Sequence, residues 1–408
     1  MAKVAILGFG TVGSGVLEVL RTNAQGISRR AGQEVAVKYI LEVRDFSAHP
    51  DADLFVQDID VILSDPEVTA VVETMGGVRF AYPFVKQCLE SGRSVSTSNK
   101  ELVATHGAEL LAIAKEKGCA FLFEAAVGGG TPIITPMHQC LAANVISAVY
   151  GIVNGTTNFM LTKMMRENMD FAPALKIAQD LGYAETKDPG DDVDGRDAQR
   201  KIAILSSIAS GVHVHPQNIP ARGIREITVA DLAFAEELNS VIKLIAWMKK
   251  GEDGSLCAGV EPMLVPKENQ LAGVEDVYNA VLMRGDMLGD VMFYGKGAGK
   301  LPTASAVVAD VVDALKNGAS VHDSLFWQPS LPAEEVFTDE MPATYYMRVE
   351  GAGLADLIAA LGTDDVMESA TGTVAVLLKD AAPAVLAKAQ QAIAACGGNV
   401  CLLLKTLA

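Results

Sequence analysis

The chain opens on MAKVAILGFGTVG, residues 1–13, and this stretch decides the fold of its first part. The apolar run at 3–7 predicts a buried strand, and the residues from Val12 to Leu20 then repeat at helical spacing. Glycines spaced G-x-G-x-x-G between a strand and a helix allow a tight turn and close approach of the backbone to a pyrophosphate. The alternative is a purely structural turn. We expect a nicotinamide dinucleotide, contacted by Gly8, Gly10, Thr11, Val12 and Gly13.

The second predicted strand, Val35–Leu41, ends where cofactor choice is usually made. An acidic residue there binds the ribose 2′-hydroxyl of NAD, whereas an arginine accommodates the 2′-phosphate of NADP. This chain carries both signals, Glu42 and Arg44. Arg44 is therefore either a ligand for NADP or a solvated loop cation, and the sequence leans to NADP while leaving NAD open.

Further strand-like runs alternate with helical stretches over the first part of the chain. They are Val68–Glu73, Ser94–Thr97 and Ala120–Phe123. Strand alternating with helix predicts βαβ units and a parallel, doubly wound sheet. We therefore expect an α/β fold with a Rossmann-type dinucleotide-binding domain at 1–131, completed by a return segment at about 295–325.

The pattern of predicted strands and helices changes from about residue 145. A strand-like run at Val145–Val153 precedes long helical stretches, and more apolar pieces follow around 257–265 and 278–293. This pattern predicts an α+β domain at 132–294, and its position after the nucleotide-binding domain suits substrate binding. We also expect it to be the substrate-binding and dimerisation domain. After a Pro-containing linker at about 327–342, strands and helices alternate again, which predicts a small, separate α+β module at 343–408.

Composition excludes several classes of protein. Lys and Arg number 33 against 50 Asp and Glu, a formal net charge of -17 that repels a nucleic acid backbone. No apolar run approaches the ~20 residues that span a membrane. The six cysteines are scattered without a CxxC pair, which favours reduced thiols and a cytoplasmic location. His213 and His215 form an isolated HxH, which we interpret as structural.

The most informative segment is a cluster of six carboxylates within thirteen positions, Glu185 to Asp197, followed by Lys201. An acidic surface loop is the simplest alternative, and the spacing does not fit an EF-hand calcium loop. Asp197 and Lys201 are i and i+4 at the start of a predicted helix, so they share one face. Because Lys201 borders an apolar helix, burial lowers its pKa while carboxylates raise it, which suits a proton donor.

A second lysine, Lys100, follows the predicted strand Ser94–Thr97. Ligands bind at the carboxyl ends of such parallel strands. We therefore expect Lys100 and Lys201 to face one cleft between the two larger domains.

Several long motifs in this order resemble homoserine dehydrogenase over nearly the whole chain. The segment 178–201 has that family's G-[FY]-x-E…D-P…D-x-x-G-x-D-x-x-x-K arrangement. Supporting motifs are Ser98-Asn99-Lys100-Glu101-Leu102, Gly151-Ile-Val-Asn154-Gly155-Thr156-Thr157-Asn158 and Gly297-Ala298-Gly299. The resemblance implies NAD(P)-dependent interconversion of L-homoserine and L-aspartate 4-semialdehyde, in threonine, methionine and isoleucine biosynthesis, by a homodimer or homotetramer.

The resemblance also implies roles for single residues. Lys201 matches the family's acid/base lysine, Lys100 the lysine near nicotinamide and substrate, and Asp197 a carboxylate that orients them. The substrate's amino group would be held by Glu185, Asp191 and Asp192. Thr74 matches the loop beside the nicotinamide, and Gly297 matches a cofactor contact.

One glycine-rich stretch is similar to the family's monovalent-cation loop, with a hinge that binds no ion as the alternative. Oxygen ligands suit sodium. The matching residues are Glu124, Val127, Gly129 and Thr131.

The sequence departs from the family pattern in two places. A two-residue spacer, Thr186-Lys187, separates Glu185 from Asp188, where one residue is usual. The last module resembles an ACT domain in strand–helix order, but its first loop is Glu350-Gly351-Ala352-Gly353-Leu354 and lacks the usual Asp-x-Pro-Gly. Feedback by an amino acid such as threonine therefore has little support in the sequence.

Two rival functions remain open. One is a dehydrogenase for another small amino or hydroxy acid, and the other is a non-catalytic amino-acid sensor.

Overall fold

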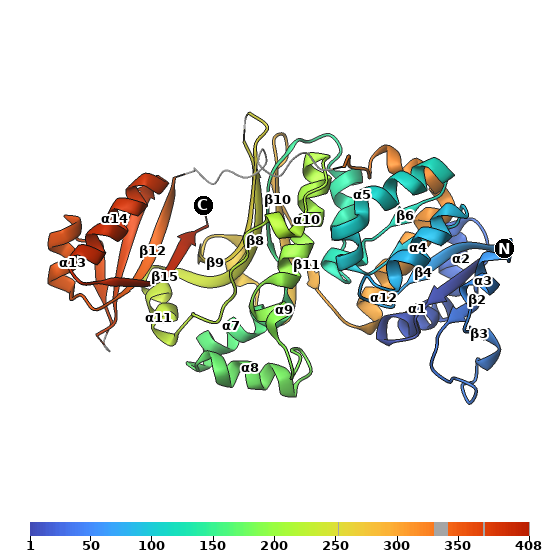
Figure 1. Cartoon of the computed structure of the whole chain (residues 1–408), viewed down its shortest axis with the longest axis horizontal. Coiled ribbons are helices and arrows are strands. Elements are labelled where there is room, and N and C mark those ends of the chain that lie inside the picture. Colours follow the sequence, from blue (N-terminus) through green and yellow to red (C-terminus); the bar gives the residue numbers. More distant parts are fainter. Residues whose placement is uncertain (252, 330–341, 370–371, 408) are drawn as a thin grey trace.

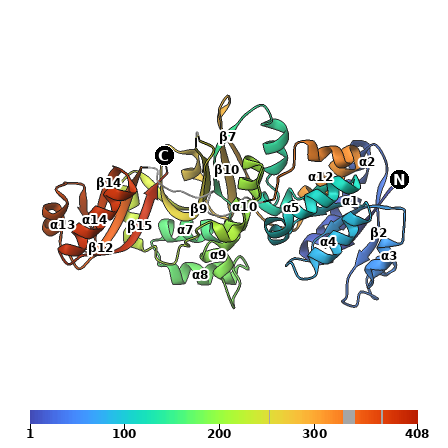
Figure 2. The ribbon, with the colours of Figure 1, turned by 45° about the horizontal axis from the view of Figure 1, so that its top comes forward.

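The computed structural model describes residues 1–251, 253–329, 342–369 and 372–407. Three parts lie in a row, as Figures 1 and 2 show from two sides. The N-terminal part contains one sheet with helices on both faces. The middle and C-terminal parts contribute to a second sheet. Most of the predicted linker lies outside the described residues. No described helix is long and apolar enough to cross a membrane.

The first sheet confirms the predicted parallel, doubly wound arrangement. Its six strands are all parallel and run in the order β3-β2-β1-β4-β5-β6. They are β1 (Ala2–Leu7), β2 (Val35–Leu41), β3 (Phe55–Val56), β4 (Val68–Glu73), β5 (Ser94–Thr97) and β6 (Phe121–Leu122). The order reverses between β1 and β4, and ligands of such sheets bind at the carboxyl ends of the strands that flank this point.

Alternate residues of β1 explain why helices cover both faces. Val4 and Ile6 share a core with α1 and α12, while Ala5 and Leu7 share the core that includes α4 and α5. The helix α12 is the predicted return segment, and it packs on α1. The helices of this part are α1 (Thr11–Thr22), α2 (Ala24–Ala31), α3 (Ile59–Leu63), α4 (Ala81–Glu90), α5 (Lys100–Lys117), α6 (Ala125–Gly128) and α12 (Lys300–Asn317).

The second sheet is mixed and has nine strands in the order β11-β10-β7-β8-β9-β15-β12-β14-β13. Its middle part holds β7 (Ile146–Ile152), β8 (Ser240–Lys250), β9 (Leu256–Pro266), β10 (Tyr278–Gly285) and β11 (Gly289–Lys296). The helices beside it are α7 (Gly155–Glu167), α8 (Phe171–Asp180), α9 (Gly190–Val193), α10 (Arg196–Ser210) and α11 (Val229–Glu237).

The C-terminal module is not separate, contrary to the sequence prediction. Its strands continue the sheet of the middle part, because β15 pairs with β9 in parallel at Lys405 and Thr406. A buried ion pair between Arg348 and Asp231 also joins the two parts. The module comprises β12 (Ala343–Glu350), α13 (Leu354–Leu361), β13 (Val366–Glu368), β14 (Val374–Ala381), α14 (Pro383–Ala395) and β15 (Asn399–Thr406).

One strand of the middle part was missed for a physical reason, whereas the strand-like pieces expected at 278–293 are confirmed. The strand β8 was missed because nine of its eleven residues are buried, so its sequence lacks the alternation of a half-exposed strand. The apolar run predicted at 278–293 is a hairpin of two strands, β10 and β11. Gly289 after the turn has a φ of +76°, a conformation that glycine adopts freely.

Candidate functional site

The glycine loop after β1 forms a cradle that a side chain would fill. Gly8 has a φ of +91°, and a Cβ on Gly13 would lie 2.1 Å from the Gly8 carbonyl oxygen. The hydroxyl of Thr74, just after β4, donates to that same oxygen at 2.9 Å. A Cβ on Gly10, which precedes α1, would meet no other atom within 4 Å, so this side of the turn is open. The loop therefore fits the close approach of a dinucleotide pyrophosphate.

The two residues predicted to select the cofactor contact each other after β2. The Arg44 guanidinium donates to Glu42 Oε2 at 2.7 Å and to the Phe9 carbonyl at 3.0 Å. Glu42 Oε2 also accepts the Phe9 N–H at 3.0 Å. The hydrogen bond from Arg44 is the main cause that lowers the pKa of Glu42 to about 2. Arg44 is 59% exposed, so its guanidinium lies at the surface beside the glycine loop.

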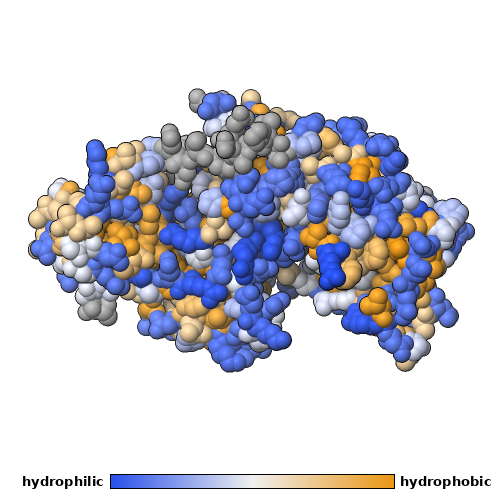
Figure 3. Space-filling model, in the orientation of Figure 1, coloured by the Kyte–Doolittle hydropathy of each residue, from blue (hydrophilic) through white to orange (hydrophobic). Residues whose placement is uncertain are grey.

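A cleft of about 610 Å³ separates the N-terminal part from the middle part. The lower outline of the molecule is notched near this boundary in Figure 3, and hydrophilic side chains gather beside the notch. Residues that line the cleft come from both parts. Those predicted from sequence are Val12, Lys100, Val127, Gly129, Asp192, Asp197, Lys201 and Gly297.

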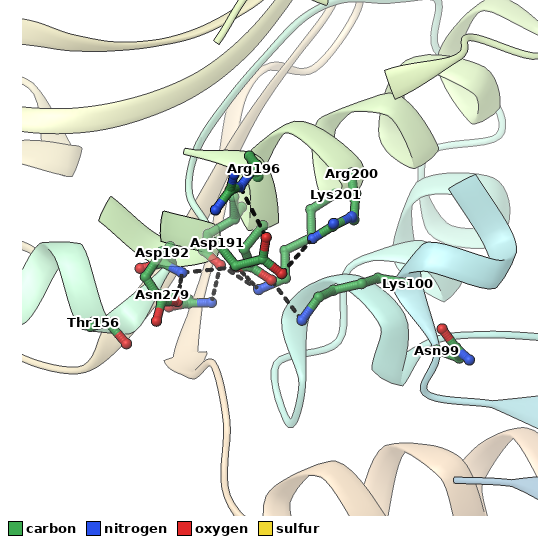
Figure 4. A network of polar contacts seen from close by, with 12 residues as sticks. Asn99, Lys100, Thr156, Asp191, Asp192, Arg196, Arg200, Lys201 and Asn279 are labelled. Carbon is green, nitrogen blue, oxygen red and sulfur yellow. Dashed lines mark hydrogen bonds and ion pairs between the residues drawn. The ribbon is translucent and has the colours of Figure 1, made fainter. Parts of the chain in front are cut away.

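Lys100 and Lys201, which the sequence places at one cleft, both line it and converge on one carboxylate. Lys201 comes from α10 and Lys100 from the first position of α5, after the N-cap Asn99 (Figure 4). Asp197 forms an ion pair with each lysine: its Oδ2 lies 2.8 Å from Lys201 Nζ, and its Oδ1 lies 2.7 Å from Lys100 Nζ. Lys201 Nζ also donates to the Val153 carbonyl, just after β7, at 2.7 Å.

Burial and charge set the protonation of these three groups. Burial is the largest cause that lowers the pKa of Lys201, and Asp197 opposes it only in part. Burial also pulls the pKa of Lys100 down, but Asp197 outweighs it and the pKa is raised. Burial alone would raise the pKa of Asp197, yet the two ammonium groups hold it well below its usual range. Two lysines on one carboxylate thus differ in proton affinity, and Lys201 releases its proton more readily.

Sequence reasoning gave no role to Asn154, which holds two carboxylates in place. Its side-chain oxygen caps α7 by accepting the Thr157 N–H at 2.9 Å. Its Nδ2 donates to Asp192 Oδ1 at 2.7 Å and to Asp197 Oδ2 at 2.9 Å. Burial raises the pKa of Asp192 above its usual value. An asparagine before a helical pattern is an N-cap signal, but nothing in the sequence pairs it with these two carboxylates.

Comparisons with known proteins point to one family. Two family models match, homoserine dehydrogenase at residues 132–312 and the homoserine dehydrogenase NAD binding domain at residues 8–124. A homoserine dehydrogenase of Bacillus subtilis (strain 168) is 41% identical over 320 residues, 77% of this chain and 73% of that protein. The crystal structure of a homoserine dehydrogenase from Thiobacillus denitrificans is 35% identical, with a TM-score of 0.87 over 100% of this chain and 98% of that one.

A hyperthermophilic archaeal homoserine dehydrogenase in complex with NADPH is 30% identical, with a TM-score of 0.65 over 77% of this chain and 97% of that one. The chain belongs to the homoserine dehydrogenase family. Members of this family are oxidoreductases that act on a CH–OH group, and the N-terminal part of this chain is its NAD-binding domain.

Two of the predicted substrate carboxylates do not line the cleft. Glu185 is exposed in the segment between α8 and α9. Asp191 is also exposed, and its carboxylate contacts Arg196 at 3.1 Å and Arg200 at 2.9 Å. Only Asp192 of the three lines the cleft. The neighbouring positions Asp191 and Asp192 thus face different surroundings, which spacing alone did not distinguish.

In the predicted cation loop, the Glu124 side chain is surrounded by backbone N–H groups. Glu124 accepts the N–H groups of Ile133, Ile134 and Thr135 at 2.6, 2.9 and 2.6 Å. Oε1 accepts two of these N–H groups and Oε2 accepts one, so at most one of the roughly four lone-pair sites of the carboxylate is left for the predicted sodium ion. Any cation would depend on backbone carbonyls such as those of Val127 and Gly129, and we derive no catalytic step through it.

Proposed function

We propose that this chain interconverts L-homoserine and L-aspartate 4-semialdehyde with a nicotinamide dinucleotide, and that Lys201 transfers the proton. The observation that carries the proposal is the convergence of Lys201 and Lys100 on Asp197 in the cleft. This cleft is also lined by Val12 of the glycine loop and by Gly297. A buried lysine with a lowered pKa beside a dinucleotide cradle suits proton exchange with an alcohol that is oxidised or formed. The bound nicotinamide supplies or accepts the hydride.

The contacts of Lys201 determine where its proton goes. An ammonium group has three N–H donors. Within the described part of the chain two of them are used, one by Asp197 Oδ2 and one by the Val153 carbonyl. The third donor is left for the substrate oxygen when the aldehyde is reduced. In the opposite direction the neutral amine keeps both hydrogen bonds and directs its lone pair to the substrate hydroxyl, so one geometry serves both directions.

The other polar groups of the cleft suit binding of the amino acid. Asp192 lines the cleft, is half-buried and has a raised pKa. A substrate ammonium beside it would lower this pKa again, because an opposite charge favours the ionised carboxylate. Lys100 has a raised pKa and stays cationic, so it suits the substrate carboxylate or the carbonyl oxygen. Glu185 and Asp191 stay as predicted ligands that would have to turn toward the cleft.

For the cofactor we propose a preference for NADP. The archaeal relative was solved in complex with NADPH. In this chain, Glu42 sits where NAD enzymes hold the 2′-hydroxyl, but its carboxylate is occupied by Arg44 and by the Phe9 N–H. The exposed Arg44 guanidinium keeps N–H groups free of those contacts and is available to a 2′-phosphate.

The domain bounds, the oligomeric state, the location and the pathway are also proposals. The two sheets support a dinucleotide-binding unit at 1–131 with its return segment at 295–325, a catalytic unit at 132–294 and an ACT-like module at 343–408. A homodimer or homotetramer, a cytoplasmic location and a place in threonine, methionine and isoleucine biosynthesis rest on the family resemblance.

The proposed reaction is tested by following NADPH and NADH oxidation with aspartate 4-semialdehyde, and NADP and NAD reduction with L-homoserine. Other short aldehydes, 2-keto acids and L-threonine serve as comparison substrates. We expect turnover with the semialdehyde and homoserine well above the rest, and faster with NADP(H). Equal or better turnover of another pair would identify a different dehydrogenase. Binding of amino acids without any turnover would identify a sensor.

A further inference from the structure

One backbone carbonyl accepts hydrogen bonds from two side chains, the proposed acid/base lysine and a buried asparagine. The Val153 oxygen accepts Lys201 Nζ at 2.7 Å and Asn279 Nδ2 at 3.1 Å. Asn279 lies in β10 and is only 2% exposed. Figure 4 shows Asn279 in the same network as Lys201. A carbonyl that accepts two N–H groups is restrained in direction, so Asn279 restrains an anchor of Lys201 without lining the cleft itself.

The same side chain packs against the cofactor side of the cleft. A Cβ on Gly297 would lie 2.1 Å from Cγ and 2.1 Å from Nδ2 of Asn279. The amide of Asn279 therefore occupies the space beside Gly297 where other residues carry a side chain. Gly297 lines the cleft and follows β11, the hairpin partner of β10. Asn279 Oδ1 has no hydrogen-bond partner among the described residues, so the Val153 carbonyl and the Gly297 backbone are the contacts that define its position.

We propose that Asn279 is a positioning residue that aligns Lys201 with the cofactor side of the cleft. It holds the Val153 carbonyl, which accepts one of the two used donors of Lys201. With the other donor on Asp197, this sets the direction of the third. It also sets how closely the Gly297 backbone approaches that assembly. This inference rests on the proposed function and adds to it a residue that lies outside the motifs that carry the family resemblance.

The chemistry of the position requires an amide that is both small and a donor. Leucine has the same branched arrangement of side-chain heavy atoms, with larger terminal groups, and cannot donate to the Val153 carbonyl. Alanine also leaves a void beside Gly297. A displacement of a reacting group by about 1 Å can lower turnover about 100-fold. We therefore expect Asn279→Leu to lower kcat at least about 10-fold, with the KM for NADPH changed less than about twofold.

The experiment compares Asn279→Leu and Asn279→Ala with the wild type, after wild-type turnover of aspartate 4-semialdehyde has been established. That first step separates failure of the proposed function from failure of this inference. Asn144→Asp is the matched control, because Asn144 precedes β7 near the opposite end of β10 and, among the described residues, its side chain hydrogen-bonds to Leu141 and Leu288. Its kcat should equal that of the wild type. Thermal melting checks that each variant is folded.

Two readouts distinguish positioning from a structural role. The solvent deuterium isotope effect on kcat should rise in Asn279→Leu, because proton transfer by a misplaced Lys201 becomes slower. Gly297→Ala should be strongly impaired, and Gly297→Ala/Asn279→Ala should be no worse than Asn279→Ala, because removal of the amide makes room for the methyl group.

Three results would overturn the inference. The first is a kcat for Asn279→Leu within threefold of the wild type with an unchanged isotope effect. The second is a loss explained entirely by weaker NADPH binding or by unfolding. The third is an additive loss in the double variant. If Asn279→Leu does not fold, Asn279→Ala and the double variant decide the question alone.

Discussion

Replacing Asp197 by asparagine removes the charge that both lysines share. The buried partner is Lys201, with side-chain exposures of 10% for the lysine and 7% for the aspartate at 2.8 Å. Breaking a buried pair by removing one partner costs about 3–5 kcal/mol, because the other charge stays buried. The Lys100 pair adds less, since that lysine is 39% exposed and is screened by water. We expect Asp197→Asn to lose about 3–5 kcal/mol of unfolding free energy at pH 7.

The pH dependence of this loss is the sharper test. Burial already lowers the pKa of Lys201 in the folded protein, and removing its carboxylate lowers that pKa further. The unfolded chain then binds more protons than the folded one, so the stability of the variant rises with pH. The difference in unfolding free energy between the variant and the wild type should therefore become smaller between pH 7 and pH 9.5, as Lys201 becomes neutral.

Asp231→Asn is the matched control for this experiment. Asp231 is fully buried and pairs with Arg348, away from the cleft. Arginine does not deprotonate in this range, so the control should lose a similar amount of stability at both pH values. Urea unfolding at pH 7 and pH 9.5 measures all three proteins, and kcat of Asp197→Asn should fall at least about 100-fold. A gap that stays constant with pH, as in the control, would refute the reasoning about Lys201.

Three further predictions concern other parts of the chain. Gly13→Ala should abolish NADPH binding measured by fluorescence titration, because its methyl group would lie 2.1 Å from the Gly8 carbonyl; normal binding would exclude the cradle. Arg44→Ser should weaken NADPH at least about 10-fold and leave NADH within about threefold, and equal losses would argue against a 2′-phosphate contact. Burial lowers the pKa of His213 to about 4, so stability present above pH 6.5 is lost as the pH falls. From pH 7.5 to pH 5 that loss is about 2 kcal/mol. The His213→Gln variant keeps an acceptor for Trp327. Its unfolding free energy, measured with urea, should fall by about 2 kcal/mol less than that of the wild type between pH 7.5 and pH 5. An equal fall in both proteins would contradict this prediction.

The sequence predicted those parts of the site that depend on local geometry. Asp197 and Lys201 lie four positions apart on one helix, and their ion pair follows from helix geometry. Lys100 follows a parallel strand whose carboxyl end faces the ligand side of the sheet. The glycine loop needs only its own spacing and the strand before it. Local pattern and tertiary structure agree at these positions.

The parts that were missed depend on contacts between distant segments. Asn279 and Val153 are 126 positions apart, and no local pattern pairs them. β15 pairs with β9 at Lys405 and Thr406, and no local pattern indicates this join between distant strands. The module after the Pro-containing linker was therefore predicted to be separate. Asp191 and Asp192 are neighbours in sequence, but packing of the single-turn helix α9 decides that only Asp192 lines the cleft.

The central claim is that Lys201 exchanges a proton with the substrate in a cleft that also holds the dinucleotide. Lys201→Met tests it most directly, because methionine keeps much of the side-chain volume and removes the ammonium group. We measure kcat for NADPH-dependent reduction of aspartate 4-semialdehyde and, separately, the Kd for NADPH. The account predicts a kcat lower by about 100- to 10,000-fold with a Kd within about threefold of the wild type. A variant that turns over at a rate near that of the wild type would contradict it.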